Sequence, residues 1–352
     1  MQQHKGPEFF LGGHMKAGFL SLFSQLQAAS VMDHAYILKG GPGSGKSTLM
    51  RRLGEALEAR GDEVEWIPCA SDPDSLDAVY DRTTRRAVLD GTAPHVQDPF
   101  HPGAVQTLVN VGEAWSEAEL RGHRDDIVRL TGEIGSRHAR ADAYISAAAA
   151  LLSRVRGEAA EFVSEEAVAA LSAHILADIP EGRGREEERL LSAVSVGRIA
   201  FFGGTLQSCC VRLYTVEDRW GAGAAALMAA LRARAGLAGI DRIVCVGPIE
   251  PALPEHLIFP AASVGVCTIN RFHSVEHPGR IEVEGFYRPI PEEKKAALAV
   301  LEADAAGLIE RACDAIAEAK TLHDDLEKFY IGAMDFSQME TRYQNLFAAM
   351  TE

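Results

Sequence analysis

The sequence has few cysteines, and they form no recognisable metal-binding or redox motif. The six cysteines stand at positions 69, 209, 210, 245, 267 and 313, mostly within apolar runs, and no two of them are spaced as C-x-x-C. A cysteine-based zinc cage and a thioredoxin-like redox pair both use that spacing. We therefore expect these thiols to be reduced residues of the core.

Positive charge is also scarce. Lysine and arginine number 35 against 50 aspartates and glutamates, which gives the 352 residues a net charge of −15. A protein that binds a phosphate backbone needs clustered basic side chains that stand out from such a background. We therefore expect no duplex nucleic acid among the partners.

A long hydrophobic run is missing as well. Residues 16–23 faintly resemble a signal sequence, but Ser24, Gln25 and Gln27 end that apolar run early. A helix needs roughly 20 apolar residues in succession to span a bilayer. We expect a cytoplasmic protein with no membrane span.

What the sequence does contain is a complete phosphate-binding motif of the form G-x-x-x-x-G-K-[ST]. It lies between an apolar run at 35–38 and a pattern of helical period from Thr48 onward. The motif consists of Gly40, Gly41, Pro42, Gly43, Ser44, Gly45, Lys46, Ser47 and Thr48. In such loops the backbone N–H groups and the helix N-terminus hold phosphate, the lysine contacts the β- and γ-phosphates, and the hydroxyl after it holds Mg²⁺. The context of strand, loop and helix predicts binding of ATP and Mg²⁺.

Three more polar residues follow predicted strands in the first half. Asp90 closes the apolar run 86–89, as a Walker B carboxylate does, and is predicted to hold Mg²⁺ together with Ser47. Asp72 follows the predicted strand 63–69, where it either orients water or caps a helix predicted over 73–80. His95 lies on the loop after Asp90, with a water-orienting role or a capping role. With Lys46, these residues are the catalytic candidates.

Residues 196–352 echo the first half at a constant offset of 178, the difference between positions 46 and 224. This offset places Tyr36 on Tyr214 and His95 on His273, and it also aligns the surrounding apolar runs. A repeat of one α/β unit follows, although any two such units share some apolar periodicity.

The differences between the two halves concern the residues assigned to Mg-ATP. Lys46, Ser47 and Asp90 become Ala224, Ala225 and Thr268. Gly40 becomes Asp218, and a carboxylate there would repel a phosphate. We therefore predict that the second half has lost its nucleotide.

The predicted fold class is α/β, with two three-layer α/β/α halves, mainly parallel sheets and a helical segment after each sheet. Residues 103–178 and 291–329 are expected to be helical. The predicted domains are a nucleotide-binding domain with its helical extension at 1–180, a charged linker at 181–195 that contains glycine, and a degenerate domain at 196–352. An arginine aimed at the γ-phosphate often assists ATP hydrolysis, and the sequence does not choose among Arg82, Arg85, Arg86, Arg198 and Arg219.

Three segments together resemble a bacterial family of tandem P-loop ATPase-like proteins within the P-loop NTPase superfamily. They are LKGGPGSGKSTLM at 38–50, CASDPDSLD at 69–77 and DGTAPH at 90–95. The resemblance implies ATP binding in the first half and, in some relatives, a second P-loop. This sequence departs from the second P-loop through Ala224 and Ala225, so a second nucleotide is not implied here.

Three functional hypotheses follow from these observations. The leading one is a Mg²⁺-dependent ATPase whose nucleotide state repositions the second half. The alternatives are a kinase that transfers the γ-phosphate to a small molecule or nucleotide, with Asp72 as base, and a nucleotide-gated scaffold for a protein partner with little turnover. No N-K-x-D tetrapeptide for guanine is present, which favours ATP over GTP.

Overall fold

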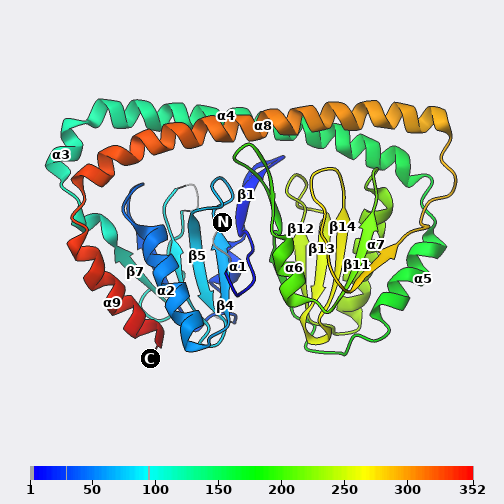
Figure 1. Cartoon of the computed structure of the whole chain (residues 1–352), viewed down its shortest axis with the longest axis horizontal. Coiled ribbons are helices and arrows are strands. Elements are labelled where there is room, and N and C mark those ends of the chain that lie inside the picture. The colour runs from blue at the N-terminus through cyan, green and yellow to red at the C-terminus, as the bar shows by residue number, and fades with distance from the viewer. Residues whose placement is uncertain (1–3, 29, 94–95, 352) are drawn as a thin grey trace.

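The computed structural model describes residues 4–28, 30–93 and 96–351. Two α/β halves stand side by side, and two long helices cross above both of them (Figure 1). The helices of this part of the chain are α1 Phe23–Leu26, α2 Lys46–Arg60, α3 Glu117–Gly122, α4 Arg124–Ala160, α5 Glu165–Leu176, α6 Gly203–Cys209, α7 Ala222–Leu237, α8 Glu292–Ala333 and α9 Ser337–Thr351. Two short 3-10 helices, η1 Val111–Ala114 and η2 Pro260–Ala262, complete the set.

The first sheet is mixed. Within the described residues it has the strand order β4-β5-β6-β3-β7, made of β3 His34–Lys39, β4 Val64–Pro68, β5 Leu76–Asp81, β6 Arg86–Asp90 and β7 Gln106–Asn110. Strand β3 is parallel to β6 and β7, whereas β5 is antiparallel to both of its neighbours, β4 and β6. The α/β class is confirmed, and the sheets, predicted to be mainly parallel, combine parallel and antiparallel pairs.

The mixed sheet arises where a predicted helix is a strand. Residues 73–80 were predicted to be helical after a cap at Asp72, but Ser75 N donates to Asp72 O at 2.8 Å and closes a turn instead. Strand β5 then begins at Leu76, and each of its residues is buried. A strand covered on both faces shows no alternation of polar and apolar residues, so periodicity alone does not distinguish it from a helix.

Strand β7 also lies in a segment that was predicted to be helical, residues 103–178. It is an edge strand with alternating exposure, and Leu108 is 51% exposed. An edge strand of five residues with polar ends gives only a weak sequence signal. The rest of that segment is mainly helical, in α3, α4 and α5.

The second sheet repeats this topology. Its described strands, in the order β15-β11-β14-β13-β12-β8, are β8 Glu186–Arg189, β11 Arg212–Glu217, β12 Arg242–Val246, β13 Pro254–Phe259, β14 Val264–Ile269 and β15 Arg280–Val283. Strand β11 is parallel to β14 and β15, and β13 is antiparallel to its two neighbours. Strands β11, β12 and β13 begin 178 positions after β3, β4 and β5, as the numbers 34 and 212, 64 and 242, and 76 and 254 show.

The segment predicted as a linker, residues 181–195, carries structure of its own. Strand β8 pairs with β12, and Ser192–Ser195 forms β9, which makes a hairpin with β10 Arg198–Phe201. The matching hairpin of the first half consists of β1 Gly12–Met15 and β2 Gly18–Ser21. The boundary between the halves is therefore a packed layer rather than a free linker.

The two halves share this layer through both apolar and charged contacts. Phe10 and Leu190 exchange two backbone hydrogen bonds of 2.9 and 3.0 Å, and one hydrophobic core continues across both halves. Glu65 of β4 accepts a hydrogen bond of 2.6 Å from Nε of Arg189 in β8, and it also pairs with Arg82. Neither Glu65 nor Arg189 is more than 2% exposed. A buried ion pair therefore joins the sheets directly.

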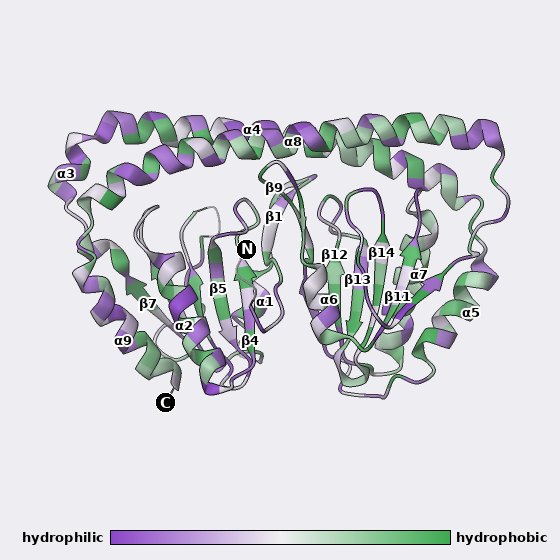
Figure 2. Ribbon diagram, viewed as in Figure 1, coloured by the Kyte–Doolittle hydropathy of each residue, from purple (hydrophilic) through white to green (hydrophobic). Residues whose placement is uncertain are grey.

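The two halves also exchange their last helices. Helices α4 and α8 pack along each other in opposite directions above the sheets (Figure 1). Helix α5, which follows α4, packs on α7 of the second half, and α9, which follows α8, packs on α2 of the first half. Polar and apolar residues are mixed along α4 and α8 (Figure 2). In the described part of the chain, no helix is both long and apolar enough to cross a membrane.

Candidate functional site

The loop between β3 and α2 has the backbone of an anion-binding turn. Gly43 has a φ of +65° and Gly45 a φ of +81°, a left-handed region that favours glycine. Helix α2 begins at Lys46, so the unpaired N–H groups of its first turn lie at this loop. The other residues of the motif lie in the same turn, with Gly40, Gly41, Pro42 and Ser44 in the loop and Ser47 and Thr48 in the first turn of α2.

Lys46 folds back over the loop. Its ammonium nitrogen donates to the carbonyl oxygens of Gly41 and Gly40 at 2.8 and 3.1 Å, and it lies 3.5 Å from a carboxylate oxygen of Asp90. The side chain is only 8% exposed. The ammonium group is therefore held at the loop by neutral carbonyl groups that phosphate oxygens could replace.

The two residues predicted to hold Mg²⁺ lie at the same edge of the sheet as the loop. Asp90 is the last residue of β6 and stands in register with Leu38 of β3. One of its oxygens accepts hydrogen bonds from N and Oγ1 of Thr92, and the other is the one beside Lys46. Ser47 Oγ accepts a hydrogen bond of 3.0 Å from Leu76 N. Hydroxyl and carboxylate oxygens are the ligands that Mg²⁺ prefers.

The structure describes only one of the other two catalytic candidates, Asp72. Asp72 lies after β4, with one carboxylate oxygen 3.5 Å from the ammonium nitrogen of Lys320 in α8. Burial lowers the pKa of Lys320, but Asp324 and Asp72 outweigh it and raise that pKa. Asp72 is therefore tied to the long helix. His95 lies outside the described residues, and its predicted role stays a prediction.

Three of the five candidate arginines lie far from the loop. Arg86 and Asp90 are the first and last residues of β6, roughly 13 Å apart at the rise of a strand. Arg82 pairs with Glu65, and Arg85 donates to carbonyl groups before β3. Arg219 pairs with Glu302 in the second half, and Arg198 belongs to β10.

The end of α8 covers the loop, which no sequence pattern predicted. Gly43 N donates a hydrogen bond of 3.1 Å to a carboxylate oxygen of Glu327. A Cβ on Gly41 would lie 2.6 Å from the ring of Tyr330, so a larger residue there would force this ring to shift. Glu327 therefore occupies one of the N–H donors that a phosphate would use. Its position depends on the exchange of helices, which local patterns do not encode.

The matching loop of the second half keeps the backbone but fills the cradle with a side chain. Gly221 has a φ of +73° and corresponds to Gly43. The carboxylate of Asp218 accepts hydrogen bonds from Trp220 N at 3.0 Å and Ala224 N at 2.8 Å. The N–H group that would face an anion at the start of α7 is therefore already paired within the chain.

Tyr287 completes this filling and was not anticipated from the sequence. Its hydroxyl oxygen accepts from Gly223 N at 2.8 Å and from Ala222 N at 3.1 Å, and the hydroxyl group donates to Asp218. Burial, reinforced by the Asp218 carboxylate, raises the pKa of Tyr287 well above its usual value. The hydroxyl group stays neutral and satisfies the helix terminus without a bound ligand.

The first loop thus combines a helix N-terminus, an ammonium group and two oxygen ligands at one edge of a sheet. Such an arrangement can bind a polyphosphate with a divalent cation. No family model, curated protein or solved structure matches the chain. The function of the chain is therefore inferred from its own residues and contacts.

Proposed function

We propose that the chain is an ATP-binding protein and a Mg²⁺-dependent ATPase with one working phosphate site, in its first half. The observation that carries the proposal is the Gly-rich loop with buried Lys46 beside Asp90 at the carboxyl edge of parallel strands. Each half would be a P-loop unit, as the resemblance to tandem P-loop ATPases implies, with the second half degenerate. Such a protein would act in the cytoplasm, where ATP is available.

Each residue has a defined role in this proposal. Lys46 exchanges its loop carbonyl groups for β- and γ-phosphate oxygens, and Ser47 and Asp90 hold the metal. Mg²⁺, when bound, neutralises charge on the phosphates. Asp72 would orient the attacking water once its ion pair with Lys320 opens, and His95 stays a candidate for the same task. An arginine for the γ-phosphate is not assigned.

Binding requires a movement, because Glu327 holds a donor of the loop. A phosphate would have to displace this carboxylate and lift the end of α8 from Gly41 and Gly43. Helix α8 runs from the second half to the first (Figure 1), so a shift at one end reaches the other half. This geometry supports the hypothesis that the nucleotide state repositions the second half.

The same cover favours a second candidate function, a nucleotide-gated scaffold. In that case ATP would release α8 and α9 from the loop and expose a surface for a protein partner, with little turnover. A kinase acting on a small molecule or nucleotide is the remaining enzymatic alternative, in which Asp72 would be the base. Whether hydrolysis, transfer or gating follows binding is a separate question from binding itself.

Calorimetry with ATP and Mg²⁺ tests the binding site. We expect Lys46→Ala to weaken binding by about 100-fold or more, because two charge-assisted hydrogen bonds to phosphate are lost. Lys295→Ala is the matched control, since Lys295 lies in the first turn of α8 and pairs only with Glu292 in the described contacts. Micromolar affinity retained in Lys46→Ala would overturn the assignment.

Turnover distinguishes the three functions. Phosphate and ADP are measured side by side, first alone and then with a panel of metabolites. Phosphate released without an added compound supports the ATPase, whereas ADP that forms only with an acceptor, without free phosphate, supports the kinase. Binding without either product supports the scaffold.

A further inference from the structure

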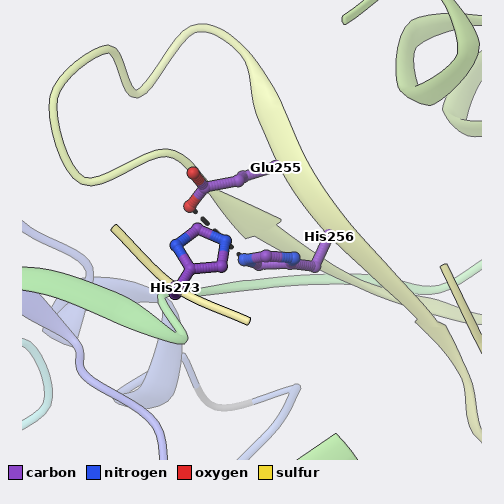
Figure 3. A group of neighbouring side chains, drawn as sticks. All are labelled: Glu255, His256 and His273. Carbon is purple, nitrogen blue, oxygen red and sulfur yellow. Dashed lines mark ion pairs between the residues drawn. The ribbon is translucent and has the colours of Figure 1, made fainter. Parts of the chain in front are cut away.

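A cluster of two histidines and a glutamate lies at the carboxyl edge of the second sheet. His256 in β13 pairs in register with Cys245, but the next residue of β12, Val246, pairs with Pro254, so Glu255 is the extra residue of a β-bulge. Bulges re-aim side chains and are common beside functional sites. Figure 3 shows the carboxylate of Glu255 beside the rings of His256 and His273, and the ligand atoms of all three lie within 4.8 Å of one another.

The hydrogen bonds of this cluster leave lone pairs that are available to coordinate a cation. His273 Nε2 lies 3.0 Å from the carbonyl oxygen of Thr268, which can only accept, so Nε2 carries the proton and Nδ1 presents its lone pair. Nδ1 itself makes no hydrogen bond within the described residues. Glu255 is oriented by Ser192 Oγ at 2.8 Å. Ligating histidines and carboxylates in metal sites are held by outer partners of this kind.

His256 is the most unusual member. It is fully buried, and neither ring nitrogen makes a hydrogen bond of proper geometry in the described part of the chain. Its closest charged group is Glu255, whose carboxylate oxygen lies 3.3 Å from Nε2. The ring of Phe201 packs against both imidazoles, at 5.6 and 4.5 Å between centroids. The ion pair offsets part of the cost of burying this ring, but Nδ1 has no hydrogen-bond partner within the described residues, and desolvation of that nitrogen is costly.

The cluster borders an open space. A cavity of about 640 Å³ is lined by Glu255 and His273 and, on its other walls, by Arg156, Arg219 and Arg271. A cation held by the three side chains would therefore keep one coordination position open to the cavity. Zinc sites with three protein ligands and one open position have this arrangement.

We propose that Glu255, His256 and His273 bind a divalent transition-metal ion such as Zn²⁺. Two imidazoles and one carboxylate suit Zn²⁺, Fe²⁺ or Co²⁺ rather than Mg²⁺ or Ca²⁺, which take oxygen ligands. The site goes beyond the proposed ATPase, because it lies in the other half and uses different residues. It also needs none of the six cysteines.

The site belongs to the second half alone. At the offset of 178, Glu255 corresponds to Asp77 and His256 to Ala78, and alanine has no ligand atom. The first half therefore carries the residues assigned to Mg-ATP but has no counterpart of His256. The second half carries His256 but lacks the residues assigned to Mg-ATP.

Metal titration of the full chain, stripped with a chelator and free of nucleotide, tests the proposal. We expect equimolar binding of Zn²⁺ by calorimetry, and of Co²⁺ with the visible absorption bands of a bound ion. Glu255→Gln and His273→Gln should each weaken binding by at least about tenfold. The matched control is His323→Gln, because His323, Asp324 and Glu327 are the other described group that could hold a metal. This control should bind as the wild type does.

Two results would overturn the proposal. One is absence of equimolar binding to the wild type, and the other is undiminished binding in Glu255→Gln and His273→Gln; loss in His323→Gln would then place the ion at the other group. Ser192→Ala serves if either ligand variant fails to fold, because it keeps all three ligands and removes only the hydrogen bond to Glu255. It should still weaken metal binding about tenfold or more. Unchanged affinity of Ser192→Ala would contradict the proposal. Lys46→Ala should bind the metal normally, so failure of the ATP proposal is recognised separately.

Discussion

The loops at Gly40–Gly45 and Asp218–Gly221 share a backbone conformation but differ in the groups that satisfy their N–H donors. Both follow a central parallel strand, both place a glycine at positive φ at the matching position, and both lead into a helix. In the first loop an ammonium group lies over the turn, and the N–H of Gly43 is paired to Glu327, a residue on a distant helix. In the second, Asp218 and Tyr287 satisfy the helix terminus from within the same half.

If the first loop binds phosphate as proposed, the difference shows how such a site can be lost without a change of fold. The N–H groups of a helix N-terminus need acceptors whether or not a ligand is present. A carboxylate and a hydroxyl group of the same half satisfy them in the second loop, whereas the carboxylate in the first loop comes from the end of a distant helix, which a ligand could displace. We therefore expect the first loop to be reversible in its occupancy and the second to be closed. Four predictions test this comparison and the contact that joins the two halves.

The largest effect is expected at the contact that makes the two halves one unit. Glu65→Ala should destabilise the protein by about 3–5 kcal/mol, because buried Arg189 and its neighbour Arg82 both lose a fully buried carboxylate and keep only the partly exposed Glu187 as a partner. Chemical denaturation measures the change in the free energy of unfolding. Glu63→Ala, an exposed neighbour on the same segment, is the control and should be nearly neutral. Equal stability of the two variants would show that the halves do not depend on this pair.

The same contact predicts a dependence on pH. Burial raises the pKa of Glu65, but Arg189 and Arg82 outweigh it and hold that pKa below its usual value. A depressed folded-state pKa contributes stability above the unfolded-state value, about 4.3, and this contribution is lost as pH falls. The difference in stability between wild type and Glu65→Ala should therefore shrink on acidification. A constant difference would contradict the pairing.

Tyr287→Phe tests the closed loop. Removing the hydroxyl group leaves the N–H groups of Ala222 and Gly223 without their acceptor, which should cost about 1–3 kcal/mol. Nucleotide binding should not appear at this loop, because Asp218 remains and Ala224 supplies no ammonium group. Tyr144→Phe, on helix α4, serves as the control for loss of a hydroxyl group. A second ATP bound by Tyr287→Phe would refute the comparison.

Glu327→Ala tests the reversible loop and has the smallest expected effect. Without its competitor for Gly43 N, ATP should bind roughly tenfold more tightly, equivalent to about 1.4 kcal/mol. Calorimetry of the variant beside Asp325→Ala measures this, since Asp325 pairs with Lys328 on the same turn. Weaker binding in Glu327→Ala would mean that this carboxylate supports the site rather than blocking it.

Some of the fold could be predicted because its signals are local. The apolar run at 35–38 lies within β3, the helix predicted from Thr48 onward begins two residues earlier at Lys46, and Asp90 ends β6. Strand β5 was missed because burial on both faces removes the alternation that marks a strand. Strand β7 was missed because a short polar edge strand owes its pairing to β3 and not to its own composition.

The candidate sites divide in the same way. Lys46, Ser47 and Asp90 follow recognisable patterns, and the offset drew attention to His273 as the counterpart of His95. His256 and Glu255 carry no motif, because the bulge that turns them toward His273 is a property of paired strands. The cysteines pointed away from a metal site, and the proposed ligands lie among histidines instead.

By itself, the sequence determined the Gly-rich loop, the residues suited to Mg-ATP and the two halves related by a constant offset. Each of these follows from contiguous residues or from a repeated spacing, so local backbone preferences are enough to specify it. The tertiary structure alone decided the exchange of α5 and α9, the cover of Glu327 over a loop 284 positions away, and the filling of the second cradle by Tyr287. Those contacts depend on how apolar faces pack, and many pairings of faces satisfy the same local periodicity.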